Sequence, residues 1–99
     1  MNEEKTFNEY YEYYLTLHQN KTNRWLHVLG QCVTLTVLFH ALTTQNWFLL
    51  LIVPFVIYPF AWTGHFFFEK NKPAAWSRPL WAKACDWLMF KDIIIGKIK

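Results

Sequence analysis

The chain has 99 residues, of which 54% are hydrophobic and only 17% charged, and its formal net charge is +3. This length allows one domain. Between Arg24 and Glu69 lie 44 consecutive residues, 25–68, without a formal charge. A soluble domain this small exposes much of its surface and could hardly keep such a run away from water. The composition therefore argues against a soluble enzyme, a disordered chain and a nucleic-acid-binding module, and the basic residues near the C-terminus suit anionic lipid head groups.

The first predicted element is an amphipathic helix over residues 6–18. Thr6 and Glu9 form the T-x-x-E pattern of a capping box, which marks a helix start. Aromatic and apolar residues then recur at steps of three and four, which places them on one side of the helix. Such a helix lies on a membrane surface or against its neighbours. The residues on this side are Phe7, Tyr10, Tyr11, Tyr14, Leu17 and His18.

The uncharged run predicts two transmembrane helices, over residues 24–42 and 47–68. A bilayer core about 30 Å thick needs roughly 20 helical residues, so the run fits two spans joined by the polar stretch 43–46. All ten Lys and Arg lie outside the uncharged run, and none lies in the stretch that joins the two spans. By the positive-inside rule both termini are then cytoplasmic, in a bacterial inner membrane or the endoplasmic reticulum. The alternative is a buried helical hairpin within a larger soluble assembly.

The last predicted element is an interfacial helix over residues 77–95, opened by Ser77, Arg78 and Pro79. We expect Lys83 and Asp86 to face water. The opposite side would meet apolar surroundings through Trp81, Ala84, Cys85, Leu88 and Met89. The sequence thus predicts an all-α fold, a single membrane domain over residues 1–99 with a two-helix hairpin and flanking amphipathic helices.

Three of the four histidines are predicted to reach the same membrane interface. His18 ends the first helix, His27 lies just inside the first span, and His65 lies near the end of the second. His40 is 13 residues beyond His27, roughly 20 Å along the helix. We therefore separate His40 from the other three and assign it no role.

Further polar residues lie at the level of these histidines. Gln31 follows His27 by four residues and Glu69 follows His65 by four, so each pair shares a helix face. Ionisable groups at membrane depth are costly and indicate function. Imidazoles with a carboxylate can bind a transition metal, and two histidines with a carboxylate suit non-haem Fe(II). The alternative is a hydrogen-bond network that pins the surface helix to the hairpin. Asparagines at the same level are Asn20, Asn23 and Asn71.

Two ordered motifs carry a family resemblance. The first is H-Q-N-x-x-N-x-x-x-H over residues 18–27, and the second is W-x-G-H-x-x-x-E-x-N-x-P-A over residues 62–74. Together they resemble the small integral membrane family of the fungal 2-hydroxy fatty acid dioxygenase of phytosphingosine breakdown. The resemblance implies an enzyme that uses Fe(II) and O2 to shorten a 2-hydroxy fatty acid by one carbon, an α-oxidation. It carries the family's site to His18, His27, His65, Glu69 and Asn23.

The substrate and the supporting residues follow from the same reasoning. Gln31 and Asn71 would support the metal ligands. Lys70, Lys72 or Arg78 would steer the substrate carboxylate, or only contact lipid phosphates. A homodimer would supply a four-helix core. Two other functions stay open: a non-catalytic membrane protein that binds lipid head groups, and a zinc-dependent membrane hydrolase that uses the same histidines.

Overall fold

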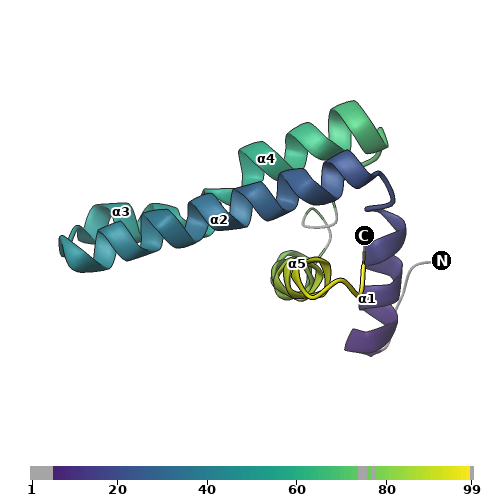
Figure 1. Ribbon diagram of the computed structural model, residues 1–99, viewed down its shortest axis with the longest axis horizontal. Helices are drawn as coiled ribbons and strands as arrows, with labels where there is room; N and C mark the ends of the chain where they lie inside the picture. The colour runs from purple at the N-terminus through teal and green to yellow at the C-terminus, as the bar shows by residue number, and fades with distance from the viewer. Residues whose placement is uncertain (1–5, 74–75, 77, 99) are drawn as a thin grey trace.

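The protein is helical throughout the described part of the chain. A computed structural model describes residues 6–73, 76 and 78–98. Its elements, shown in Figure 1, are α1 (Phe7–Thr16), α2 (Lys21–Thr43), α3 (Trp47–Ile52), the 3-10 turn η1 (Val53–Phe55), α4 (Ile57–Gly64), the π-helical turn η2 (His65–Glu69) and α5 (Pro79–Ile94). No strand occurs among these residues, so the predicted all-α class is confirmed.

A long antiparallel hairpin forms the body of the molecule. Two helical stretches, Lys21–Thr43 and Trp47–Glu69, are long and apolar enough to cross a membrane. Gln45 adopts φ 55° in the turn between them, and the Asn46 side chain accepts a hydrogen bond from Leu49 N that caps α3. The two long apolar helices of the prediction are therefore confirmed. The second one is interrupted by η1, which contains Pro54.

Two glycines let the arms of the hairpin approach closely. A Cβ at Gly30 would lie 2.6 Å from Ile57 Cδ1, and a Cβ at Gly64 would overlap the side-chain amide of Asn23. Small residues at a helix crossing allow the backbones to come together, and in a bilayer such packing replaces the hydrophobic drive. These two contacts fix α4 against α2 at the end of the hairpin away from the turn.

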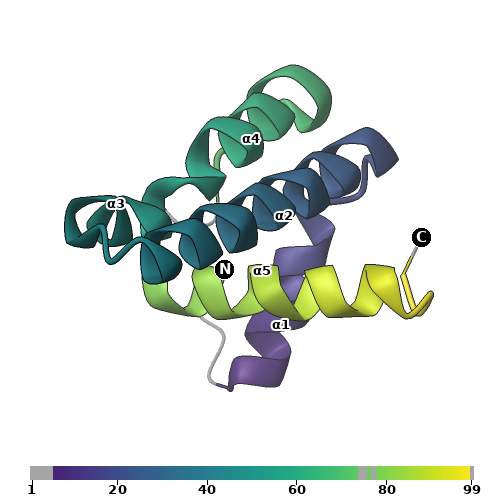
Figure 2. The same cartoon turned by 60° about the vertical axis from the view of Figure 1, so that its left-hand side comes forward.

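The remaining helices pack at that same end. The predicted capping box is present, because Glu9 N donates to Thr6 Oγ1 and Thr6 N donates to Glu9 Oε1. The axis of α1 runs across that of α2 (Figure 1), and α5 crosses beneath α2 (Figure 2). A buried core joins α1, α2 and α5; its members are Tyr10, Tyr14, Val28, Ala82, Cys85, Met89 and Ile93.

The expected orientation of the C-terminal helix was wrong at Asp86. This carboxylate is buried, with only 5% of the residue exposed, whereas Ala84 is exposed. The cause is that α5 packs against both α1 and α2, so a side that would face water in an isolated interfacial helix is covered. Polar partners on α2 then satisfy the buried carboxylate. Ser77, where the sequence placed the helix start, lies outside the described residues, and α5 begins at Pro79.

Candidate metal centre

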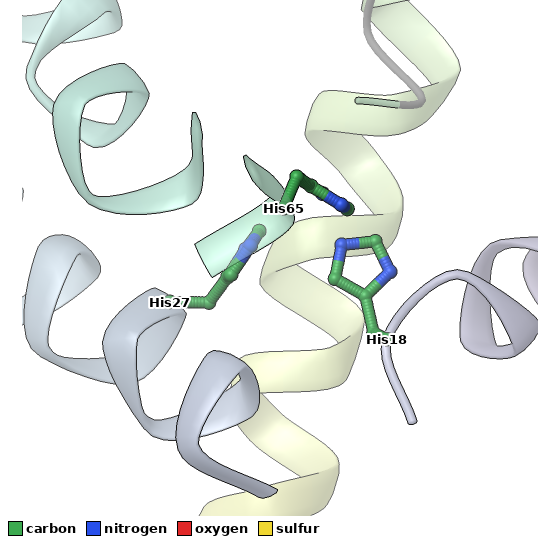
Figure 3. Close-up of side chains that lie close together, drawn as sticks. All are labelled: His18, His27 and His65. Carbon is green, nitrogen blue, oxygen red and sulfur yellow. The ribbon is translucent and has the colours of Figure 1, made fainter. Parts of the chain in front are cut away.

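Three histidines from different elements converge where the hairpin meets α1 and α5. His18 follows α1, His27 lies in the second turn of α2, and His65 begins η2. One ring nitrogen of each lies within 4.8 Å of those of the others. All three side chains are buried, and Figure 3 shows the rings pointing toward one another. The three histidines can therefore form a metal site.

The outer nitrogen of each ring is occupied by a hydrogen bond. Nδ1 of His18 lies 2.7 Å from the Tyr14 carbonyl, Nδ1 of His27 lies 2.9 Å from Asp86 Oδ1, and Nδ1 of His65 lies 2.6 Å from Asn71 Oδ1. Each partner atom is an acceptor, so Nδ1 carries the hydrogen in all three rings. In a neutral imidazole the free lone pair is then on Nε2.

The Nε2 atoms of two of these rings face the centre without a protein partner. Nε2 of His18 and Nε2 of His27 are buried and make no hydrogen bond. Leaving a buried polar atom unpaired is costly. A bound metal ion removes that cost, and histidine ligands ordinarily donate their other N–H to a carboxylate or carbonyl, as here. The donor set thus fits a transition metal.

A further layer of hydrogen bonds holds the acceptors in place. Asp86 Oδ2 accepts a 2.6 Å bond from Gln31 Nε2, so one helix face of α2 engages both oxygens of Asp86. Asn71 Nδ2 donates to the Leu17 carbonyl at 3.1 Å. The second bond ties the loop after η2 to the segment that carries His18. Gln31 and Asn71 act on the histidines in this way rather than by direct contact with the centre.

Glu69 lies beside the three-histidine group and holds the start of α2. Its Oε2 accepts bonds from Asn20 N at 2.6 Å and Asn23 Nδ2 at 3.2 Å. A carboxylate at a helix N-terminus also interacts favourably with the helix dipole. Asn20 itself caps α2 by accepting from Thr22 N and Asn23 N. The π-helical turn η2 spans both His65 and Glu69, and such turns occur frequently at functional sites.

The environment of the centre favours neutral side chains. Burial lowers the pKa of His18, and the neighbouring His27 and His65 lower it further. Burial likewise raises the pKa of Tyr14, whose ring stacks on His18 with centroids 4.0 Å apart. A histidine must be neutral to bind a metal. The fold therefore favours the neutral form of His18, which is the form that a metal ligand needs.

A small cavity adjoins the three histidines. Its volume is about 30 Å³, and a site needs roughly 10–15 Å³ to hold one water. The cavity thus has room for an ion and a small ligand. Apolar and aromatic groups make up much of the rest of its lining, and Lys83 and Asp86 line it from α5. The apolar and aromatic groups include Ile57, Tyr58, Ala61 and Trp62.

One known protein family matches nearly the whole chain. The family described as "2-hydroxy-palmitic acid dioxygenase Mpo1-like" matches residues 4–98. The chain belongs to this Mpo1-like family. No curated protein and no solved structure matches it. Membership confirms the resemblance carried by the two histidine motifs and gives a 2-hydroxy fatty acid dioxygenase as the activity that the family name describes.

The basic residues that the sequence suggested for substrate binding, and His40, lie outside the cavity beside the histidines. Lys70, at φ 60°, and Lys72 are both exposed. The Arg78 guanidinium lies over the rings of Tyr10 and Trp81, at 5.6 and 4.9 Å from their centroids. His40 is exposed near the other end of α2. None of these four lines the cavity beside the histidines.

Two residues of the site were missed by the sequence reasoning, and both are on α5. Asp86 orients His27, and the Lys83 ammonium donates to the Pro54 carbonyl at 2.6 Å. Burial lowers the pKa of Lys83, while the charge of Asp86 raises it. A signal for Asp86 existed in the spacing of His27 and Gln31, since two buried donors on one helix face need an acceptor. No corresponding signal indicated Lys83.

Proposed function

We propose that this Mpo1-like protein is an Fe(II)-dependent dioxygenase that shortens 2-hydroxy fatty acids by one carbon at the membrane interface. The observation that carries the proposal is the pair of buried, unpartnered Nε2 atoms of His18 and His27, in a group of three histidines whose ligand nitrogens lie within 4.8 Å of one another. Imidazole donors suit Fe, Zn, Cu and Ni alike. Iron is favoured because the family name describes a dioxygenase and zinc has no redox chemistry.

The residues divide between holding the metal and holding its ligands. His18, His27 and His65 would bind the iron, which supplies the redox chemistry between O2 and the substrate. Asp86, Gln31 and Asn71 fix the ring orientations. For Glu69, the contacts of Oε2 with Asn20 and Asn23 support a role in holding α2 and its His27, and Glu69 does not belong to the group of three residues whose ligand atoms converge.

The proposed reaction balances without an added reductant. A 2-hydroxy acid R–CH(OH)–COOH and O2 give R–COOH, CO2 and H2O. The bond between C1 and C2 breaks, C2 is oxidised to a carboxyl carbon, and C1 leaves as CO2. The substrate loses four electrons and O2 gains four. The chain's own part is to place substrate and O2 side by side in a dry site, which is the main contribution that orientation makes to catalysis.

The membrane supplies the surroundings that such a substrate needs. The two long helices would span the bilayer with both termini cytoplasmic, because every Lys and Arg lies outside residues 25–68 and none lies in the turn that joins the two helices. The three histidines then lie at the cytoplasmic interface, where a fatty acid can present its carboxylate while its chain stays in the lipid. Contacts with membrane lipids, and a homodimer of the hairpins, belong to the same proposal.

The test uses detergent-purified protein loaded anaerobically with Fe(II) and then given O2 and 2-hydroxypalmitate. We expect about stoichiometric iron, and one CO2 released per O2 consumed. His27→Ala and His65→Ala should lose both metal and activity, while His40→Ala, a histidine remote from the centre, should keep both.

Other outcomes would point to the two alternative functions. Protein that stays metal-free after iron loading would contradict the dioxygenase and favour a non-catalytic lipid-binding role. Turnover that persists without O2 in zinc-loaded protein would favour the hydrolase. Iron-loaded protein that consumes no O2 with any 2-hydroxy acid would also reject the proposal.

A further inference from the structure

A second cavity runs along α2 beside the metal centre. Its volume is about 310 Å³, at the lower end of the range typical of small-molecule sites. It lies between α2, the α3–η1 segment and α5, and we call it the α2–α5 groove. Apart from one lysine, the described residues that line it are uncharged: Gln31, Thr34, Leu35, Leu38, Leu50, Val53, Pro54, Ile57 and Trp87.

The groove and the metal-centre cavity adjoin at two residues. Ile57 and Lys83 line both of them. Gln31 lines the groove and also donates to Asp86, which lines the cavity beside the histidines. A molecule lying in the groove would therefore reach the three histidines by passing the Lys83 side chain.

Lys83 is placed at this junction as a cation with hydrogen-bonding capacity to spare. Its Nζ donates one bond to the Pro54 carbonyl and lies 5.0 Å from the centre of the Tyr58 ring. An ammonium group has three donors. Both oxygens of the nearby Asp86 are already bonded, to His27 and Gln31. A half-buried ammonium beside an apolar groove is stabilised by an anion that brings its own apolar body.

We propose that the α2–α5 groove binds the acyl chain of a fatty acid and that Lys83 binds its carboxylate where the groove meets the metal centre. One cation at the inner end of an otherwise uncharged groove matches one carboxylate on a long hydrocarbon. The stretch from Gln31 to Leu38 gives the groove a length of about 10 Å along α2. The inference rests on the proposed function for its link to turnover, but binding itself requires no metal.

The proposal assigns the carboxylate to a different residue from those that the sequence suggested. Lys70 and Lys72 line neither the groove nor the metal-centre cavity. Arg78 also lines neither and lies over the rings of Tyr10 and Trp81. Lys83 is the basic residue that lines both.

The experiment compares two ligands on metal-free protein in detergent. Binding of 2-hydroxypalmitate and of its uncharged methyl ester is followed by quenching of tryptophan fluorescence, because Trp62 and Trp87 line the two cavities. Lys83→Gln should weaken binding of the acid roughly 10- to 100-fold, as expected for loss of a hydrogen bond to a charged group. Binding of the ester should be unchanged. Lys83→Arg should keep most of the affinity for the acid, and Lys91→Gln, an exposed lysine on the same helix, is the matched control.

Each contrary result rejects the inference. Unchanged acid binding in Lys83→Gln would show that Lys83 does not meet the carboxylate. Equal losses for acid and ester would indicate a structural role, as would loss of acid binding in a well-folded Lys83→Arg. An acid-selective loss in Lys72→Gln instead of Lys83→Gln would restore the assignment made from the sequence.

A substitution in the groove tests the acyl part separately. Leu38→Trp should block the part of the groove farthest from Lys83 along α2. We expect the affinity for the sixteen-carbon acid to fall at least tenfold relative to that for a four-carbon 2-hydroxy acid, whose chain ends in the half of the groove nearer Lys83. If Leu38→Trp changed the affinities for the long and the short acid by the same factor, the acyl chain would lie elsewhere.

Failure of this inference is distinguishable from failure of the proposed function. If the metal-free protein binds the acid through Lys83 but the iron-loaded protein consumes no O2, the binding site in the groove is supported and the proposed dioxygenase activity is rejected. If the iron-loaded protein turns over and Lys83→Gln changes neither acid binding nor KM, the dioxygenase stands and the groove inference fails.

Discussion

At the scale of single residues, Asp86 determines which nitrogen of His27 faces the centre. Its carboxylate can only accept a hydrogen, so it keeps the proton on Nδ1 and the lone pair on Nε2. The carboxylate also makes His27 a better donor to a metal. The bond from Gln31 prevents Asp86 from turning away. A residue outside the two histidine motifs thus sets the chemistry of one inside them.

The first prediction concerns this carboxylate. Asp86→Asn keeps the shape of the side chain but removes its charge, and its amide can offer an N–H donor to Nδ1. We expect the affinity for the metal to fall about 10- to 100-fold, measured by competition with a chelator of known strength. Asp92→Asn changes a carboxylate on the same helix that bonds Tyr11, and it should leave metal affinity unchanged. Equal affinities in Asp86→Asn and the unaltered protein would contradict the role of Asp86.

At the scale of elements, the contact of α2 with α4 depends on the absence of a side chain at Gly64. The space that a Cβ would take is filled by the amide of Asn23, whose Nδ2 donates to Glu69. The same crossing therefore places the start of α2, with His27 one turn later, against the turn that carries His65. Close helix packing and the position of two histidines are set by one glycine.

The second prediction is that Gly64→Ala destabilises the protein. Alanine in place of glycine ordinarily stabilises a helix by about 0.5–1 kcal/mol, whereas forcing a methyl group into a filled site costs about 1–3 kcal/mol. We expect the unfolding temperature in detergent to fall. The double variant Gly64→Ala/Asn23→Ala should regain part of the loss, because contacting residues are not additive. An unfolding temperature that rises in Gly64→Ala would show that α4 does not pack as described.

The contact between α1 and α5 depends in part on a hydrogen bond with a pH-dependent partner. The Tyr11 hydroxyl donates to Asp92 Oδ2 at 2.7 Å. This bond is the main reason that the pKa of Asp92 lies below its ordinary value. A carboxyl whose pKa is lowered by folding stabilises the fold above its unfolded pKa, about 3.9. That stabilisation is lost as the pH falls through the lower, folded pKa.

The third prediction follows from this lowered pKa of Asp92. Tyr11→Phe should lower the free energy of unfolding by about 1–3 kcal/mol at neutral pH, measured by thermal unfolding. The difference from the unaltered protein should shrink as the pH falls below about 4 and be smallest below the lowered folded pKa of Asp92, because Asp92 is then protonated in both proteins. Tyr13→Phe, on the same helix, should show no such pH dependence. A difference that stays constant down to pH 2 would exclude Asp92 as the partner responsible.

The elements differ in how far their sequence determines them. The capping box at Thr6 and the uncharged run are local signals, so α1 and the hairpin could be predicted. The common depth of His18, His27 and His65 also follows from the hairpin, because depth depends on position along a span. The sequence indicated that His27 and Gln31 need an acceptor, but not that Asp86 is this acceptor, since that depends on how α5 crosses α2, a contact between residues 55 or more positions apart. The contact of Lys83 with Pro54, 29 positions apart, likewise depends on how α5 packs against the hairpin.

At the scale of the whole molecule, the hairpin presents an apolar surface of about the right length for a bilayer. A helix of 23 residues, such as α2, is about 35 Å long, against a hydrocarbon core of about 30 Å. Five large apolar side chains on the two arms of the hairpin are 62–73% exposed. Soluble proteins rarely expose so much apolar surface in one region. The five side chains are Phe39, Phe48, Leu51, Phe55 and Phe67. Lipid tails are the natural cover for this surface.

The fourth prediction places the two ends of the hairpin on opposite sides of the membrane. Single cysteines are introduced by Gln45→Cys, in the turn between α2 and α3, and by Lys97→Cys, after α5, in protein with Cys32 and Cys85 replaced by alanine. An impermeant thiol reagent added to spheroplasts should label the first and not the second. In inverted vesicles the pattern should reverse. Labelling of both from the same side would contradict a spanning hairpin.

The scattered origin of the metal-centre residues has a consequence for how the protein is made. Synthesis proceeds at roughly 5–20 residues per second, and Asp86 is added only after His18, His27 and His65. Both arms of the hairpin therefore exist before α5 has been translated. A nascent chain at that stage has all three imidazoles but lacks the carboxylate that orients His27. We expect metal to be inserted after translation, into the finished protein, so that premature termination before α5 yields a membrane-inserted but inactive product.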